Sequence, residues 1–401
     1  MNSVNSRIMT KHSPLLGGFS PARFLADYWQ KQPLRVKNAL PGFTSPISPD
    51  ELAGLACEDE VESRIVLERD GPQPWALEIG PFDDERFARL PETHWTLLVQ
   101  ECNKYLPELI TLLERFNFIP NWRIDDIMVS YAPEHGSVGP HMDQYDVFLI
   151  QGLGRRRWQI STDPVAADNI ISGLDLRIMR DFQATDEWVL KPGDMLYLPP
   201  GIAHYGVALD DCMTFSVGFR TPTVSELLTG FLDEIASGLN DHQRYHDPDL
   251  PLQAHPGEIT AGARARIRRI IRSTMADDTA IDQWFGRYIT ESKSGQTAIP
   301  AAQPLATDEF LQQLHAAGAL WRSEYARFSF IDDGADEITL FIDGQAWPLP
   351  RALAKPVNRL CDQRQITTGE FSEALHDKPF TRLLSQLYNA GYVEFPPDDE
   401  K

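Results

Sequence analysis

The sequence contains 401 residues, of which 42% are apolar and 10% aromatic, and this composition excludes a disordered or collagen-like chain. At roughly 150 residues per domain, the length predicts two or three domains. The 58 acidic and 37 basic residues give a formal net charge of −21, which disfavours nucleic acid as the main partner and suits a basic one.

The chain shows no pattern of secretion or membrane insertion. No stretch approaches the roughly 20 apolar residues that cross a bilayer, and the N-terminal residues lack the apolar core of a signal peptide. The four cysteines (Cys57, Cys102, Cys212 and Cys361) form no CxxC pair, as expected for reduced thiols. We therefore expect a soluble, cytoplasmic protein with no membrane partner.

The N-terminal part is predicted to begin with a flexible tail and two short helices. Residues 1–18 are mostly polar and end in two glycines. Ser20 followed by Pro21 predicts the start of a helix, and residues 48–51 (SPDE) form a capping box before a second one.

From about residue 122 to 220 the pattern changes to short strands separated by turns. The expected strands lie in RIDDIMVSYAP, YDVFLIQGLG, RRRWQIS, EWVL, DMLYLPPG and MTFSVGF. Many short strands with turn signals are typical of a sandwich or a barrel.

After Arg220 the apolar residues recur with a helical period. Thr223-x-x-Glu226 is a capping box, and further helices are expected over about 258–275 and 278–290. Such a block either covers the barrel or forms a dimer interface, and the pattern alone favours neither.

The C-terminal part follows a stretch rich in Pro, Gly, Ser and Ala at residues 291–306, which predicts a linker. A helix over 308–317, a hairpin with Asp343-Gly344 at its turn, further helices and a last short strand resemble a winged-helix module. Residues 298–401 carry 9 basic and 16 acidic side chains, a net charge of −7, so we expect no direct DNA binding.

A metal-ligand pattern begins at His141. In the segment GPHMD (residues 139–143) an extended backbone points residues i and i+2 the same way, so His141 and Asp143 present an imidazole and a carboxylate to one point. Such a pair alone is weak evidence, because most occur on the surface.

A second pattern ends at His204. The segment GDMLYLPPGIAH (residues 193–204) matches G-x5-P-x-G-x2-H and resembles the second metal-ligand motif of the cupin superfamily. His141, Asp143 and His204 then form the triad of two histidines and one carboxylate that binds iron(II) and leaves positions open for oxygen and a co-substrate. A carboxylate at position 143, in place of the second histidine of storage or isomerase cupins, favours an oxygenase. The competing interpretation is a polar cluster without metal.

A buried cation is predicted within RRRWQI (residues 155–160). On a strand, Arg156 shares a face with Trp158 and Ile160, so an inward tryptophan implies an inward arginine. A buried guanidinium needs an anion, and the distal carboxylate of 2-oxoglutarate is the natural one. The alternative is a run of surface charge.

The strand before the first motif offers a further set of inward side chains. Asp126, Met128 and Ser130 alternate onto one face. If that face lines the barrel, Asp126 can form an ion pair with a cationic substrate, and Met128 can pack against the aliphatic part of that substrate. Ser130 can then bind the co-substrate together with Arg156. A solvated edge strand explains the same alternation equally well.

Together these residues resemble the Jumonji-C family of iron(II)- and 2-oxoglutarate-dependent oxygenases. The stretch WRIDDIMVSYAPEHGSVGPHMDQYDVFLIQGLGRRRWQI (residues 122–160) is similar to the bacterial ribosomal oxygenases that hydroxylate an arginine of large-subunit ribosomal protein L-sixteen. The resemblance implies an α+β fold with four parts: a flexible tail (1–18), a double-stranded β-helix or cupin/Jumonji-C jelly roll with the active site (19–222), a helical dimerisation domain (223–297) and a winged-helix-like domain (298–401).

The resemblance also implies the cofactors and their ligands. His141, Asp143 and His204 would bind Fe(II), Arg156 and Ser130 would hold 2-oxoglutarate, and O2 would be the oxidant. Hydroxylation at the arginine β-carbon is likewise implied by the family.

For the substrate, the resemblance implies a pocket around an arginine of a basic ribosomal protein. Asp126 would pair with its guanidinium, with Met128 and Tyr145 beside it, and Ser216 is a weaker candidate. The loop APEHGSVG (residues 132–139) departs from the glycine-rich loop of close relatives, which puts the detailed substrate fit in doubt.

Two other functions remain open from the sequence. The same chemistry could act on histidine or methyl-lysine of another protein, although only a cationic side chain calls for the carboxylate of Asp126. A non-catalytic cupin adaptor is the second alternative.

Overall fold

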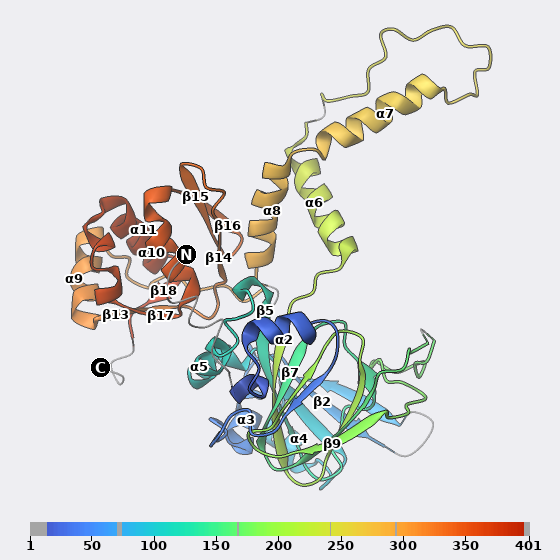
Figure 1. The fold of residues 1–401 in the computed structure, drawn as a ribbon, viewed down its shortest axis with the longest axis vertical. Coiled ribbons are helices and arrows are strands. Elements are labelled where there is room, and N and C mark those ends of the chain that lie inside the picture. Colours follow the sequence, from blue (N-terminus) through green and yellow to red (C-terminus); the bar gives the residue numbers. More distant parts are fainter. Residues whose placement is uncertain (1–13, 70–73, 167, 241, 293–294, 397–401) are drawn as a thin grey trace. The chain divides into compact units, whose positions relative to one another are not determined.

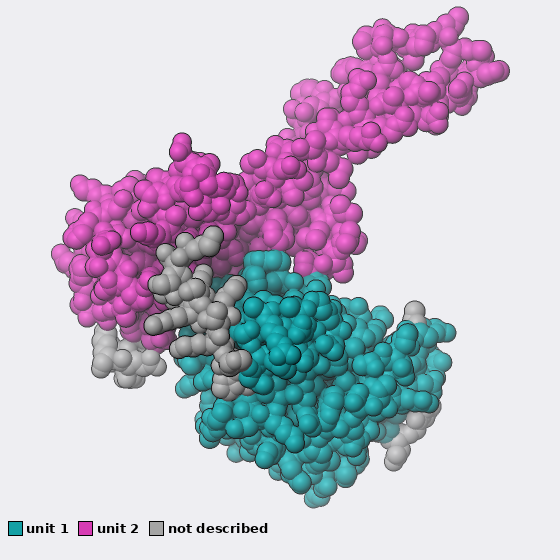
Figure 2. All heavy atoms as spheres, viewed as in Figure 1, with its two compact units in different colours: residues 1–221 teal, residues 222–401 magenta. Residues whose placement is uncertain are grey.

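The computed structural model describes residues 14–69, 74–166, 168–240, 242–292 and 295–396. The chain forms two compact units, residues 1–221 and 222–401, which are shown in different colours in Figure 2. Within the described residues, no helix combines the length and the apolar character that a membrane span requires.

The N-terminal unit is built on an antiparallel sheet of eight strands (Figure 1). These are β1 (Leu34–Val36), β2 (Ser63–Glu68), β3 (Trp75–Ile79), β4 (Trp95–Val99), β5 (Ile124–Ala132), β7 (Val147–Leu153), β10 (Met195–Leu198) and β12 (Cys212–Phe219). Their order across the sheet is β1-β10-β7-β12-β5-β4-β2-β3.

A second sheet of four strands faces the first. It consists of β6 (His141–Met142), β8 (Arg156–Ser161), β9 (Asp186–Leu190) and β11 (Ala203–Ala208), in the order β6-β11-β8-β9. Between the sheets, Leu149 of β7 and Leu196 of β10 belong to one buried cluster with Trp158 of β8 and Leu190 of β9. Two antiparallel sheets that share an apolar interior form the expected jelly roll.

Short helices pack on the other face of the large sheet. They are η1 (Pro14–Leu16), α2 (Pro21–Asp27), α3 (Pro49–Leu55), α4 (Asp84–Ala88), η2 (Cys102–Lys104), α5 (Glu108–Glu114) and η3 (Asn121–Arg123). Phe24 of α2 packs on Phe148 of β7, and Phe148 on Phe219 of β12, each with ring centroids 5.6 Å apart. Each of these fully buried aromatic side chains contributes roughly 1.5–3 kcal/mol to the stability of the unit.

The predicted helix starts are confirmed. Ser20 caps α2 by accepting a hydrogen bond from the backbone N–H of Arg23, and Ser48 and Glu51 form the capping box of α3. The capping box of Thr223 and Glu226 likewise begins the first helix of the C-terminal unit.

The C-terminal unit contains three helices followed by a compact domain of helices and hairpins. The α-helices are α6 (Val224–Gly238), α7 (Ala261–Thr274), α8 (Asp278–Thr290), α9 (Thr307–Ala317), α10 (Ala354–Asp362) and α11 (Lys378–Asn389). The 3-10 helices are η4 (Arg351–Leu353), η5 (Thr368–Phe371) and η6 (Ala374–His376).

Two three-stranded sheets complete this unit. One, ordered β17-β13-β18, joins β13 (Ala319–Arg322), β17 (Gln365–Thr367) and β18 (Val393–Glu394). The other joins β14 (Phe328–Ile331), β15 (Glu337–Ile342) and β16 (Gln345–Pro350), with the predicted Asp343-Gly344 turn between the last two. Helix α8 packs on this sheet so closely that a Cβ at Gly286 would lie 2.5 Å from the ring of Phe341.

Several features differ from the sequence predictions. Residues 1–13 of the expected tail lie outside the described residues, but Leu15 and Leu16 are buried in the main core, so the tail does not extend to residue 18. Strands β1 to β4 and β11 are additions that the sequence pattern does not indicate. Within the expected linker, Ala298 is buried in the core of the C-terminal domain.

Candidate active site

The two histidines of the sequence motifs face each other across paired strands. His141 of β6 and His204 of β11 are direct partners in the antiparallel ladder, so their side chains leave the same face of the small sheet. Gly201, at φ +82°, forms the turn before β11, and its N–H donates to the carbonyl of Asp143 at 2.8 Å. The glycine motif therefore links both ligand-bearing segments through their backbones.

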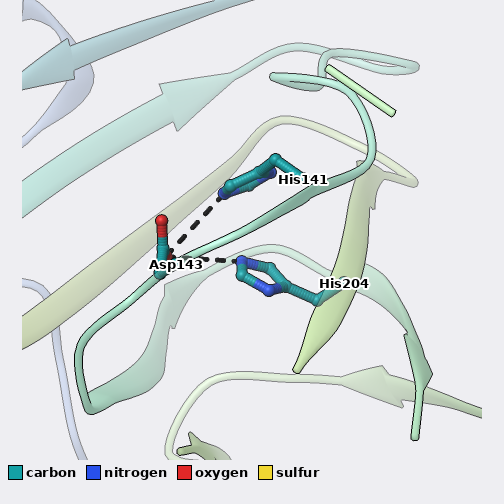
Figure 3. Close-up of side chains that lie close together, drawn as sticks. All are labelled: His141, Asp143 and His204. Atoms are coloured by element: carbon teal, nitrogen blue, oxygen red, sulfur yellow. Dashed lines mark ion pairs between the residues drawn. The ribbon is translucent and has the colours of Figure 1, made fainter. Parts of the chain in front are cut away.

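The three side chains converge on one point (Figure 3). Asp143 Oδ2 lies 3.9 Å from His141 Nε2 and 3.7 Å from His204 Nε2. One ligand atom from each residue fits within 4.8 Å of the other two, a spacing suited to a single metal ion. No other group of three such ligands is found in the described part of the chain.

The histidine rings are oriented by their own backbone. Nδ1 of His141 lies 2.9 Å from the carbonyl of Gly139, and Nδ1 of His204 lies 3.0 Å from the carbonyl of Ile202. A ring that donates from Nδ1 to a carbonyl presents the lone pair of Nε2 to a metal. Burial, reinforced by neighbouring His141, lowers the pKa of His204 to about 4, so this ring is neutral at physiological pH as a ligand must be.

Arg156 points into the interior, as predicted. It is buried on β8 together with Trp158 and Ile160, and its guanidinium carbon lies 5.6 Å from the centre of the Trp158 ring. Its Nε and Nη2 are buried and have no hydrogen-bond partner among the described residues. Buried donors of a charged group are costly when unpaired, so these N–H groups fit a carboxylate-bearing molecule such as 2-oxoglutarate.

Arg155, by contrast, is exposed and pairs with Asp210 at 2.8 Å. The alternation predicted for the arginine run is therefore confirmed for these two neighbours.

The space beside Trp158 is tight. A Cβ at Gly206 of β11 would lie 2.7 Å from the Trp158 ring, so only glycine allows this approach. The same ring lies 5.9 Å from the ring of His204. Trp158 thus lies close to both the guanidinium of Arg156 and the ring of His204.

Ser130 lies on the inner face of the large sheet. It is buried, and it pairs across the ladder with Thr214 of β12, which in turn pairs with Gln151 of β7. Ser130 Oγ is 3.5 Å from the carbonyl of Thr214, a long contact. The Thr214 hydroxyl donates to Gln151 Oε1 at 3.3 Å, so these side chains form a polar row across the interior.

The next row of the same face carries two of the predicted substrate residues. Met128 of β5 pairs directly with Ser216 of β12, and Ser216 with Leu149 of β7. Met128 packs against the small buried cluster around Val66 and Ile178. The alternation predicted for Asp126, Met128 and Ser130 is therefore an inward face and not a solvated edge.

Asp126 and Tyr145 lie near the metal-ligand carboxylate. Desolvation and the charges of Asp143 and Asp126 raise the pKa of the Tyr145 hydroxyl well above its usual value, as expected for a phenol close to both carboxylates. Oδ2 of Asp126 accepts the backbone N–H of Glu101 at 2.9 Å. A Cβ at Gly218 would lie 3.4 Å from Asp126 Oδ1, so any larger residue at position 218 would contact this oxygen.

Two side chains near Asp126 were missed by the sequence analysis. Arg64 lies on β2, and Gln100 follows β4, on strands that the pattern did not reveal. The usable signal is the charge of Arg64 within the otherwise apolar alternation of SRIVLE (residues 63–68), since a cation in a half-buried strand needs a specific partner.

Comparison with known proteins identifies two families in the chain. Residues 111–227 match the JmjC domain, and residues 273–394 match the ROXA-like winged helix. The "ribosomal protein uL16 3-hydroxylase" of Escherichia coli K12 is 38% identical over 372 residues, which cover 93% of this chain and 96% of its own. A "probable ribosomal oxygenase" of Haemophilus influenzae is 39% identical over 290 residues, 69% of each chain.

Solved structures agree with the sequence comparisons. The X-ray structure of E. coli YcfD has a TM-score of 0.85 at 36% identity and covers 94% of this chain and 98% of that one. YcfD, described as a ribosomal oxygenase, in complex with cobalt and 2-oxoglutarate has a TM-score of 0.83 at the same identity and covers 94% and 99% of the two chains. With its jelly roll, its His-Asp-His cluster and its winged helix, this chain belongs to the JmjC family of ribosomal oxygenases.

Proposed function

We propose that this chain is an Fe(II)- and 2-oxoglutarate-dependent hydroxylase that acts on the β-carbon of an arginine in a large-subunit ribosomal protein. The observation that carries the proposal is the pairing of a three-ligand cluster with a buried arginine whose Nε and Nη2 lack partners in the described residues. A metal site alone fits many reactions, whereas a metal site beside an anion-binding guanidinium fits 2-oxoglutarate chemistry.

His141, Asp143 and His204 would hold the iron, and Arg156 with Ser130 would hold the distal carboxylate of 2-oxoglutarate. When bound, the iron and the 2-oxo acid supply the oxidising chemistry: one atom of O2 enters succinate as CO2 is lost, and the other replaces a C–H by C–OH. The role of the protein is to fix the two reactants and to keep the site dry, and the apolar neighbours of Trp158 serve the second purpose.

Asp126 would receive the guanidinium of the substrate, with Met128 and Ser216 below it and Tyr145 beside it. The inward face of Met128 and Ser216 and the closeness of Tyr145 to Asp143 support this arrangement. A planar guanidinium matches a carboxylate with two parallel hydrogen bonds, which neutral imidazole cannot provide. This chemistry favours arginine over histidine as the target.

The identity of the substrate protein rests on relatives and on charge. The E. coli relative carries the name of a hydroxylase of uL16, and it matches nearly the whole chain. The net charge of −21 suits a basic ribosomal protein. We further infer that the enzyme is cytoplasmic, where ribosomal proteins are made, and that the acidic C-terminal domain does not bind DNA directly.

We also propose that the chain is a homodimer through its helical segment, residues 223–297. Helix α7 has no buried residue, and the side chains of Ile267, Ile270 and Ile271 are each about half exposed. Leu228 and Leu232 of α6 are exposed as well. A second copy of the chain that covers these residues would remove this apolar surface from water. The predicted divisions of the chain at residues 222 and 297 are kept as part of this proposal.

The decisive experiment is intact-mass analysis of ribosomal proteins from cells with and without the gene. A gain of one oxygen atom on one protein, mapped to an arginine, is the expected result. Purified enzyme with Fe(II), 2-oxoglutarate and that protein should release succinate only when the protein is present. Modification of histidine, or loss of methyl from lysine, would replace the proposed target, and absence of any turnover would leave the adaptor function instead.

A further inference from the structure

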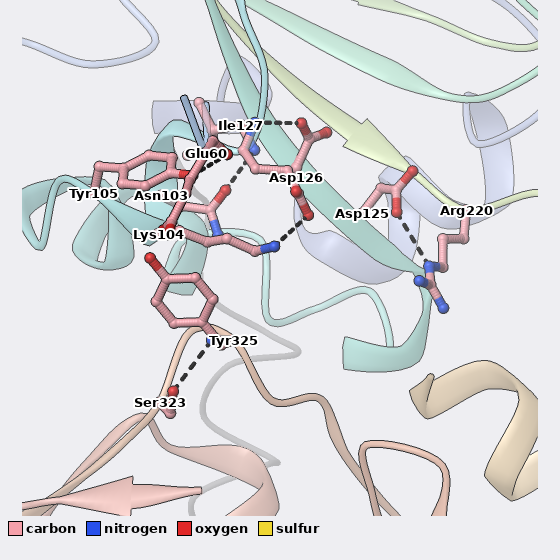
Figure 4. Close-up of polar contacts among 11 residues, drawn as sticks. Glu60, Asn103, Lys104, Tyr105, Asp125, Asp126, Ile127, Arg220, Ser323 and Tyr325 are labelled. Atoms are coloured by element: carbon pink, nitrogen blue, oxygen red, sulfur yellow. Dashed lines mark hydrogen bonds and ion pairs between the residues drawn. The ribbon is translucent and has the colours of Figure 1, made fainter. Parts of the chain in front are cut away.

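Asp126 is held by residues 100–104, a short segment from another part of the chain, which we call the clamp segment. Figure 4 shows Asn103 and Lys104 of this segment with Asp126 and Ile127. The backbone N–H of Glu101 donates to Asp126 Oδ2 at 2.9 Å. The side-chain oxygen of Asn103 accepts the backbone N–H of Ile127 at 2.9 Å. The clamp segment therefore fixes both the carboxylate of Asp126 and the strand that carries it.

The clamp segment has an unusual backbone. Glu101 adopts a left-handed conformation with φ +50°, which side-chain-bearing residues rarely accept and which persists only when the surroundings impose it. Lys104 Nζ lies 2.9 Å from Glu101 Oε1, with both side chains largely buried. A strained residue held by a buried ion pair aims its N–H at Asp126, and such strain gathers at functional sites.

Gln100 adds a second donor to the same oxygen. With its amide in the orientation that satisfies both neighbours, the nitrogen donates to Asp126 Oδ2 at 3.3 Å and the oxygen accepts from Arg64 Nη2. The amide is thus fixed between a cation and an anion, and it cannot turn over without losing both hydrogen bonds. Gln100 and Glu101 thus fix the same oxygen of the carboxylate, and they set the direction in which its plane faces.

Arg64 is separated from Asp126 by the side chain of Gln100. Its guanidinium reaches Asp126 through the amide of Gln100, and its Nε is buried without a hydrogen-bond partner among the described residues. The neighbouring Asp125 shows the alternative arrangement, since it pairs directly with buried Arg220 at 3.1 Å. A direct pair of this kind at Asp126 would occupy the carboxylate that an incoming guanidinium needs.

We propose that Gln100 is a positioning residue: its amide stands between Arg64 and Asp126, sets the plane of the Asp126 carboxylate and prevents a direct ion pair between the two. This inference rests on the proposed function, in which Asp126 receives an arginine. The orientation of the carboxylate matters for the planar two-pronged guanidinium and much less for the compact ammonium of lysine. Gln100 therefore contributes to the preference for arginine over lysine.

The test measures binding of two peptides to the full-length enzyme loaded with Mn(II) and 2-oxoglutarate. The peptides are identical except for arginine or lysine at the target position. Gln100→Leu should lower the ratio of arginine to lysine affinity by about tenfold, the equivalent of one well-oriented hydrogen bond. The KM for 2-oxoglutarate and the rate of 2-oxoglutarate turnover without peptide should stay unchanged. An unchanged affinity ratio overturns the proposal.

A second pair of variants separates positioning from a structural role. In Gln100→Leu the guanidinium of Arg64 is free to move onto Asp126, so the double variant Arg64→Met/Gln100→Leu should bind the arginine peptide better than Gln100→Leu alone. Additive losses would mean that the two residues only support the fold, and they overturn the proposal. Gln100→Glu keeps the partner of Arg64 but offers Asp126 no donor, and it should also lose arginine selectivity.

Two controls make the outcome specific. Gln159→Leu removes a similar hydrogen bond from an amide to a carboxylate, that to Glu187 at 2.7 Å, on exposed residues, and it should leave both peptide affinities unchanged. Asp126→Asn tests the proposed function itself. If Asp126→Asn leaves arginine binding intact, the substrate contact is wrong. If it abolishes binding while Gln100→Leu does not, only the inference about Gln100 fails.

Discussion

His141 and His204 lie opposite each other in one strand pair, with ring centroids 4.2 Å apart and the Nε2 atoms of both rings within 4 Å of Asp143 Oδ2. Because both rings are tied to backbone carbonyls, their positions follow from the ladder and not from the metal. The metal site is therefore a property of the folded sheet.

Asp143→Ala should abolish turnover and weaken Mn(II) binding by more than about 100-fold, because even the loss of an outer residue that supports a ligand costs about 10- to 100-fold. Calorimetric titration with Mn(II) measures the effect. His255→Ala, at an exposed histidine, is the control and should bind Mn(II) normally. Undiminished Mn(II) binding by Asp143→Ala would remove the residue from the site.

Arg156→Ala should raise the KM for 2-oxoglutarate at least about tenfold while Mn(II) binding is retained, since a charge-assisted hydrogen bond contributes about 1.5–3 kcal/mol. The wild-type enzyme should gain thermal stability on adding 2-oxoglutarate, and the variant should not. Arg155→Ala, which loses only an exposed ion pair, serves as the matched control and should behave as wild type. An unchanged 2-oxoglutarate requirement in Arg156→Ala would contradict the assignment.

Asp126→Ala should stop hydroxylation of the arginine peptide while slow turnover of 2-oxoglutarate without peptide persists. The reason is that the carboxylate contacts the substrate but neither the metal nor the co-substrate in our proposal. Asp125→Asn is the contrasting variant. It should lower Tm, because it weakens the ion pair with buried Arg220, and it should leave peptide selectivity unchanged. Coupled assays of succinate and hydroxylated peptide distinguish the two, and full peptide hydroxylation by Asp126→Ala would show that Asp126 is not the guanidinium partner.

Gly206→Ala should destabilise the protein by about 1–3 kcal/mol and raise the KM for 2-oxoglutarate, because the added methyl group must displace the Trp158 ring, which lies 5.6 Å from the guanidinium carbon of Arg156. Chemical denaturation and co-substrate kinetics test both effects. Gly54→Ala is the contrasting control: its Cβ meets nothing within 4 Å in helix α3, and it should stabilise by up to about 1 kcal/mol. A neutral Gly206→Ala would show that the ring has room to move.

Leu228→Glu combined with Ile270→Glu should convert the proposed dimer to a monomer, because two charges would enter the surface that a second copy covers. Light scattering coupled to size-exclusion chromatography measures the mass. Leu252→Glu, at a fully exposed leucine outside the helices, should leave the mass unchanged. A wild-type chain that is monomeric at micromolar concentration would rule out the dimer.

The parts of the site that could be predicted are those encoded by local alternation. Asp126, Met128 and Ser130 follow a period of two, as do Arg156 and Trp158, and a strand turns that period directly into one face. The convergence of His141, Asp143 and His204 required more than alternation. It followed from a motif whose Pro and Gly residues fix the turn before β11.

The remaining parts depend on contacts between distant segments. Gln100 and Arg64 meet Asp126 only because β2 and β4 extend the large sheet beside β5, and nothing in their local sequence fixes that pairing. The burial of Leu15 and Leu16 could not be predicted, because two apolar residues next to polar ones show no helical or strand period.

The hydrogen bond from Gly201 to the carbonyl of Asp143 has a consequence for how the enzyme handles its metal. It ties the two ligand-bearing segments together through main-chain atoms, so the pocket keeps its shape when a chelator strips the ion. We therefore expect that Fe(II) alone, without refolding, restores activity to the metal-free form.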